Sequence, residues 1–218
     1  MTGSRLREVV RATATRAPAA EEERCELCGA PIPPEHRHLV DLQTRAMLCA
    51  CQACKILFDK GAAGGGHYRL VPERRLSLDD FEMDDATWSD LQVPVDMAFF
   101  FRSSAVDRVV AFYPGPAGAT ESTLELASWE RLEAANPVLA TLAPDVEALL
   151  VNRARGARLH FLVPIEDPYR LVALIRTRWR GLTGGGDVWQ GIEDFFDDLA
   201  GRTRTASNRR EEAAWQST

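Results

Sequence analysis

Cysteine is absent from the chain after position 54, and long apolar runs are absent throughout. No segment approaches the roughly 20 apolar residues that span a bilayer, so we expect no membrane contact. Residues Met1–Glu23 contain Arg5, Arg7, Arg11 and Arg16 and lack the apolar segment of a signal peptide. These absences predict a cytoplasmic protein.

A basic surplus is also missing. The formal net charge at pH 7 is -6, with 26 Lys and Arg against 32 Asp and Glu. Because recruitment of phosphates needs a basic surface, we expect no nucleic-acid partner. The 218-residue length and 45% hydrophobic content instead predict one ordinary globular domain with a small appended module.

Composition divides the chain into five segments. They are a flexible N-terminal arm (1–23), a metal-binding module (24–60), a glycine-rich linker (61–67), an α+β domain (68–201) and a disordered tail (202–218). The linker is predicted because Gly-Ala-Ala-Gly-Gly-Gly offers few side chains for packing and loses much backbone entropy on ordering.

The α+β domain is predicted to contain a largely antiparallel sheet. Two apolar, aromatic runs at 95–101 and 106–113 flank a polar turn and indicate a strand pair covered on both faces. Residues 157–164 alternate as another strand. Helices are predicted over 121–134, 167–179 and 187–199, and a further helix is predicted to start at Pro144. We expect the helices to lie on one face of the sheet.

An acidic strip, Asp79–Asp96, contains seven carboxylates and no Lys or Arg. Four large apolar side chains lie within it: Phe81, Met83, Trp88 and Leu91. One hypothesis is a solvated face that these side chains anchor to the core. The other is a docking strip, in which they contact a basic protein partner.

Two cysteine pairs, Cys25/Cys28 and Cys51/Cys54, have the spacing at which a tight turn directs two thiolates at one cation. Together they offer tetrahedral thiolate coordination. In a reducing compartment, clustered cysteines indicate metal binding over disulfides. The sequence therefore predicts one structural zinc ion in a small module of the zinc ribbon or treble clef type, and iron remains possible.

Alternative ligands lie close by. On an extended strand Cys49 and Cys51 would share a face, so either could join Cys54; Cys51 is favoured because it reproduces the first spacing. His36 or His38 could replace one thiolate. Four thiolates could also hold a single iron in a rubredoxin-like electron carrier.

A third hypothesis is an HNH-type metal-dependent nuclease, because Glu35–Asp41 resembles the histidine-containing insertion of those enzymes. Such enzymes need a further histidine after the second cysteine pair, where this chain has Lys55. His160 is predicted to be a packed strand histidine rather than a catalytic base. No catalytic residue is predicted.

Six stretches of the sequence together resemble those of one protein family: Cys25-Glu-Leu-Cys-Gly, Leu48-Cys-Ala-Cys-Gln-Ala-Cys54, Ala98-Phe-Phe-Phe, Ala111-Phe-Tyr-Pro-Gly-Pro-Ala-Gly-Ala-Thr-Glu121, Pro144-Asp-Val-Glu-Ala-Leu-Leu150 and Trp179-Arg-Gly. They resemble an actinobacterial family commonly encoded beside nickel-iron uptake hydrogenases, with no assigned activity. The resemblance implies a non-enzymatic accessory protein whose partner is a hydrogenase subunit or maturation factor.

Overall fold

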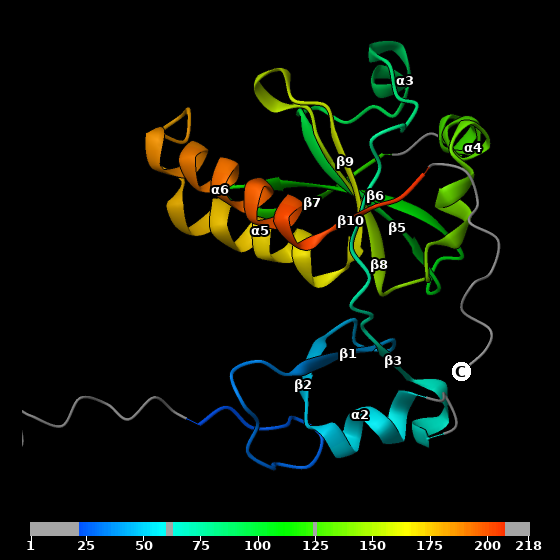
Figure 1. The fold of residues 1–218 in the computed structure, drawn as a ribbon, viewed down its shortest axis with the longest axis vertical. Helices are drawn as coiled ribbons and strands as arrows, with labels where there is room; N and C mark the ends of the chain where they lie inside the picture. Colours follow the sequence, from blue (N-terminus) through cyan, green and yellow to red (C-terminus); the bar gives the residue numbers. More distant parts are fainter. Residues whose placement is uncertain (1–21, 60–62, 124–125, 208–218) are drawn as a thin grey trace, which may run out of the picture.

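The computed structural model describes residues 22–59, 63–123 and 126–207, which form two sheets (Figure 1). The smaller has the strand order β2-β1-β3 and the larger the order β10-β4-β9-β8-β5-β6-β7. Residues 1–21 of the predicted arm and 208–218 of the predicted tail lie outside the described ranges.

The small sheet and one helix make up the metal module. Its elements are β1 (Arg37–Asp41), β2 (Met47–Ala50), α2 (Gln52–Asp59), a 3-10 helix (Ala63–Gly66) and β3 (Tyr68–Leu70). Since β3 pairs with β1, the predicted boundary after residue 67 is wrong. The glycine-rich stretch connects two elements of the same module.

The large sheet contains β4 (Leu76–Ser77), β5 (Met97–Ser103), β6 (Arg108–Gly115), β7 (Gly118–Ser122), β8 (Glu147–Asn152), β9 (Leu159–Pro164) and β10 (Arg204–Thr205). Every pairing is antiparallel except that of β10 with β4. The predicted α+β class with a largely antiparallel sheet is confirmed. Ordered residues at 202–207 correct the start of the predicted disordered tail.

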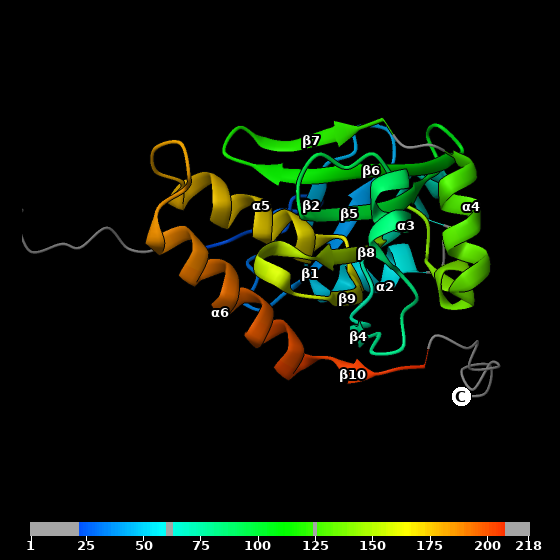
Figure 2. The ribbon, with the colours of Figure 1, turned by 90° about the horizontal axis from the view of Figure 1, so that it is seen from above.

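Helices cover both faces of the large sheet (Figures 1 and 2). They are α3 (Asp85–Asp90), α4 (Leu126–Ala135), α5 (Glu166–Arg178) and α6 (Gly186–Arg202). The α5–α6 side buries Phe99, whereas the α3–α4 side buries Phe100. Strand alternation sends these neighbours to opposite faces. The predicted one-sided arrangement is therefore wrong, because the strands are apolar on both faces.

Strand β8 replaces the helix predicted to start at Pro144. Its six residues are all buried, and it lies between β5 and β9 in the sheet. Leu149 faces the core beneath α3 and α4, and Leu150 faces the core beneath α5 and α6. Packing on two sides outweighs the local helix-start pattern.

The segment joining the module to the large domain is held by two buried carboxylates. Arg74 makes hydrogen bonds of 2.9 and 2.6 Å to Glu147, and Arg75 Nε donates to Asp167 Oδ2 at 2.6 Å. Val40 and Val71 also join the large core. The module and the large domain are thus packed together.

Within the described ranges, no helix has the length and apolarity to cross a membrane.

The acidic strip is anchored to the large domain. Asp84 caps α3 by accepting a hydrogen bond from Thr87 N at 2.7 Å, and Asp85 pairs with Arg153 and Arg158. Its four large apolar side chains are buried in the core on the α3–α4 side. The docking hypothesis based on these four side chains is therefore wrong, since a partner cannot reach them.

Candidate metal centre

The first cysteine pair lies in a tight turn. Gly29 N donates to Cys25 O and Cys25 N donates to Ala30 O, both at 2.8 Å. Gly29 has a φ of +74°, a left-handed conformation that glycine adopts without steric cost. This turn brings Cys28 back toward Cys25.

The second pair lies at the start of α2. Strand β2 ends at Ala50, so Cys51 lies between strand and helix, and Cys54 lies in the first turn of the helix. Cys54 N donates to Cys51 Sγ at 3.5 Å. Backbone N–H groups at a helix start favour thiolates. A turn, a hairpin and then a ligand-bearing helix is the order of a treble clef, one of the two predicted module types.

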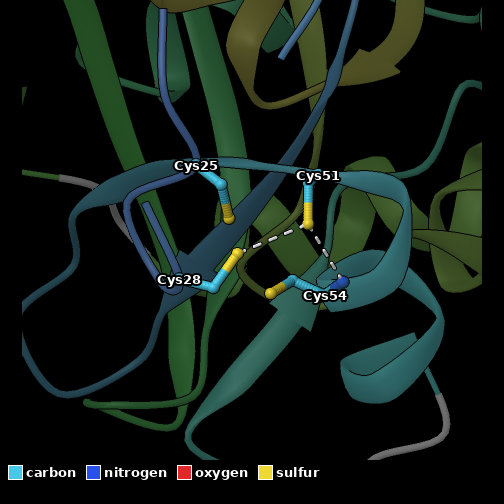
Figure 3. Close-up of side chains that lie close together, drawn as sticks. All are labelled: Cys25, Cys28, Cys51 and Cys54. Atoms are coloured by element: carbon cyan, nitrogen blue, oxygen red, sulfur yellow. Dashed lines mark hydrogen bonds between the residues drawn. The ribbon is translucent and has the colours of Figure 1, made fainter. Parts of the chain in front are cut away.

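The four predicted sulfur ligands converge on one point (Figure 3). The sulfurs of Cys25, Cys28, Cys51 and Cys54 all lie within 4.8 Å of one another. Cys28 Sγ and Cys51 Sγ are 3.6 Å apart, too far for a disulfide. Tetrahedral Zn–S bonds of about 2.3 Å place sulfurs about 3.8 Å apart. The donor set therefore fits a zinc-sized ion.

The electrostatics of the four thiols divide them into two groups. Burial opposes ionisation of Cys25, but backbone N–H donors outweigh it and lower the thiol pKa to about 6. A hydrogen bond from Cys54 N lowers the pKa of Cys51. Burial, followed by the neighbouring thiols, raises the pKa of Cys54. The backbone N–H of Ala30 opposes a rise in the pKa of Cys28, but hydrogen bonds with the Cys25 and Cys51 thiols outweigh it and raise that pKa. Neighbouring thiols oppose further ionisation, so four thiolates together need a cation.

The alternative ligands gather elsewhere. His36, His38 and Cys49 form a separate group, in which one atom of each residue lies within 4.8 Å of the others. Cys49 is the cross-strand partner of His38. The expectation that Cys49 and Cys51 share a strand face fails because β2 ends between them.

Comparison with known families gives one result. A model for a family of unknown function, DUF5947, matches residues 24–203. The chain belongs to DUF5947. Among curated proteins nothing matches it, and none of the solved structures matches either. The match to DUF5947 includes both the cysteine module and the large domain.

In this DUF5947 member, His160, Glu166 and Asp167 occupy positions that packing and helix geometry explain. His160 is buried on β9 and stacks on Phe81 at 4.7 Å between ring centroids. Glu166 and Asp167 lie in the first turn of α5, as expected for carboxylates at a helix start. Helix α2, which begins after Cys51 and contains Cys54, has no histidine, so the nuclease hypothesis gains no ligand there.

Sequence reasoning missed a pocket of about 460 Å³ between the β1–β2 hairpin and the large sheet. Its lining is mainly apolar and includes Phe101 and Tyr169, and the charged residues Arg45 and Asp145 also line it. Ser104 N donates to Asp145 Oδ1 at 2.8 Å, and Arg69 Nη1 lies 3.3 Å from Asp145 Oδ2. The pocket exists only because two sheets meet, so no local motif encodes it.

Proposed function

We propose that this protein is a non-enzymatic, metal-binding accessory protein that holds one structural zinc ion and acts through contacts with another protein. The observation that supports it is the convergence of four cysteine sulfurs from a turn and a helix start. Zinc accepts tetrahedral thiolate coordination, and four protein ligands leave no position for a substrate. The centre would therefore stabilise the module.

The metal content tests the first half of this proposal. We expect one zinc ion per chain in a colourless protein, lost in acid or with a strong chelator because protons and chelators compete for the ligands. Elemental analysis and a visible spectrum measure this. Iron with visible thiolate absorption would support the rubredoxin-like alternative, and a folded protein without metal would overturn a metal-binding function.

The partner class rests on the resemblance of the sequence to proteins encoded beside nickel-iron uptake hydrogenases. We propose a hydrogenase subunit or a hydrogenase maturation factor as the partner, in a reducing compartment that keeps the five cysteines as thiols. Co-expression with each of these proteins, followed by size-exclusion chromatography, should yield a complex with one of them. A folded, zinc-loaded protein that binds none would contradict the proposal.

Exposed apolar residues allow that experiment to locate the contact. Ile56 on α2 is 62% exposed, and Leu182, in the loop before α6, is 99% exposed. Loss of the complex in Ile56→Asp but not in Leu182→Asp would place the contact on the metal module. Metal-dependent DNA cleavage by the purified protein would instead favour the HNH-type nuclease and overturn a non-enzymatic role.

A further inference from the structure

Two histidines and one cysteine meet outside the four-cysteine centre. His38 on β1 and Cys49 on β2 lie directly opposite each other in the antiparallel pair. The rings of His36 and His38 meet edge to face, with centroids 4.8 Å apart. One nitrogen from each ring and the Cys49 sulfur lie within 4.8 Å of one another. Imidazole and thiolate are the donors that zinc and related transition metals prefer.

The His36 ring presents an unused lone pair inside the protein. Its Nδ1 lies 3.0 Å from the Pro33 carbonyl oxygen, which can only accept, so Nδ1 carries the proton. Nε2 then has a free lone pair. The side chain is only 7% exposed, and Nε2 has no hydrogen-bond partner. A buried polar atom without a partner is costly, and a metal ion at Nε2 would remove that cost.

The His38 ring is oriented by a carboxylate. Its Nδ1 lies 2.8 Å from Glu166 Oε2 and donates its proton to that carboxylate, which leaves a lone pair on Nε2 for a metal ion. Glu166 is itself held by Arg75 Nη2 at 3.1 Å. A carboxylate that accepts the second N–H of a histidine is the usual support for a metal-binding imidazole, because it sets the tautomer and raises the basicity of the ring.

We propose that His36, His38 and Cys49, brought together by the β1–β2 pair, form a second site for a divalent transition-metal ion such as Zn²⁺ or Co²⁺. Two imidazole nitrogens and one thiolate supply three ligands, and the fourth position stays open to water. Glu166 acts as a positioning residue. The second site goes beyond the proposed function, since it does not depend on a protein partner.

Local charge also favours a cation at this site. Glu23 Oε2 lies 3.5 Å from His36 Nδ1, and Glu26 Oε2 accepts a hydrogen bond from Cys49 N at 2.6 Å. With three ligands rather than four, the second site should release its ion more readily than the four-cysteine centre. It should therefore behave as the exchangeable site of the two.

Cobalt added to the full-length protein loaded with one zinc ion per chain, so that the more weakly binding second site is vacant, tests this proposal. Zinc keeps the four-cysteine centre filled and is colourless, so cobalt reports the second site by its visible bands and by thiolate-to-cobalt charge transfer. We expect one cobalt ion per chain without release of zinc. Cys49→Ala should abolish the charge-transfer band, and His36→Gln or His38→Gln should weaken cobalt binding at least tenfold. Glu166→Gln should weaken it about tenfold.

His67→Gln is the matched control, because His67 lies in the same module but contacts Gln43 instead of the cluster. It should bind cobalt like wild type. Circular dichroism and retained zinc show that each variant is folded. The proposal is overturned if the zinc-loaded protein takes up no cobalt, or if zinc is released in step with cobalt uptake. It is also overturned if Cys49→Ala keeps the charge-transfer band.

Discussion

The metal module and the large domain bury very different amounts of apolar surface. Among the described residues, the module's own core contains five buried ones, two of which are the proposed ligands Cys25 and Cys54. Within the described part of the chain, the cores on the two faces of the large sheet contain 19 and 17 buried hydrophobic residues, and the 19 include Val40 of the module. Because so small a core cannot offset the entropy of ordering its chain, the module should depend on its metal. The large domain should depend on packing.

The largest expected effect tests the dependence of the module on metal. Cys54→Ser should release the ion and unfold the module, since structural zinc contributes roughly 10 kcal/mol or more to such units. Hydrogen exchange followed by mass spectrometry should show lost protection in β1, β2 and α2, with protection retained in β5 and β8.

Cys49→Ser is the control, because Cys49 lies outside the four-sulfur group. It should keep the structural ion. Release by Cys49→Ser but not by Cys51→Ser would overturn the ligand assignment. Loss of protection throughout the large domain in Cys54→Ser would show that Val40 and Val71 join the two parts into one cooperative unit.

A second prediction tests packing in the large domain. Phe100 is fully buried against Trp129, with ring centroids 5.6 Å apart. Phe100→Ala should lower the free energy of unfolding by about 3–5 kcal/mol through the cavity it leaves, without changing the metal content. Denaturant unfolding measures this. Phe101→Ala, at a half-buried position of the same strand, should cost clearly less; equal losses would contradict the assignment of the core.

A third prediction concerns the junction between the two regions. Asp167 is fully buried and its closest charged partner is Arg75, at 2.6 Å. Arg75→Met should destabilise the protein by about 3 kcal/mol, because it leaves a buried carboxylate without its main partner. Arg170→Met is the control: Arg170 is 57% exposed and 3.5 Å from the same carboxylate, so its loss should cost under about 1 kcal/mol. If thermal unfolding shows similar losses of stability for Arg75→Met and Arg170→Met, Arg75 is not the main partner of the buried Asp167 carboxylate.

The smallest expected effect is a pH dependence within the large domain. Burial, and then the charges of Arg153 and Arg158, lower the pKa of His160 to about 4. In the unfolded chain its pKa is about 6.5, so the unfolded state binds more protons below that pH. Stability contributed by neutral His160 is therefore present above pH 6.5 and lost as the pH falls, by about 2 kcal/mol between pH 7 and 5.

His160→Leu removes this titration and serves as the comparison. Protonation of carboxylates and of the cysteine centre affects both proteins, so the difference between their unfolding free energies isolates His160. The unfolding free energy of wild type minus that of His160→Leu should therefore fall as the pH is lowered from 7 to 5. Parallel profiles would mean that His160 titrates normally in the folded protein.

Sequence by itself determined the features that depend on spacing over a few residues. The Cys25/Cys28 and Cys51/Cys54 pairs follow from turn geometry, and the β5–β6 pair follows from two apolar runs around a polar turn. Helices α5 and α6 follow from their apolar periodicity. Each of these signals is local, so it does not depend on how the rest of the chain folds.

Only the tertiary structure decided features that join distant segments. Strand β8 forms against a helix-start pattern because both of its faces meet a core, and β3 belongs to the module because β1 offers a free edge. The end of β2 at Ala50 separates Cys49 from Cys51. Glu166, 128 residues from His38 in sequence, orients that ring. Such contacts depend on long-range packing, which residue spacing does not encode.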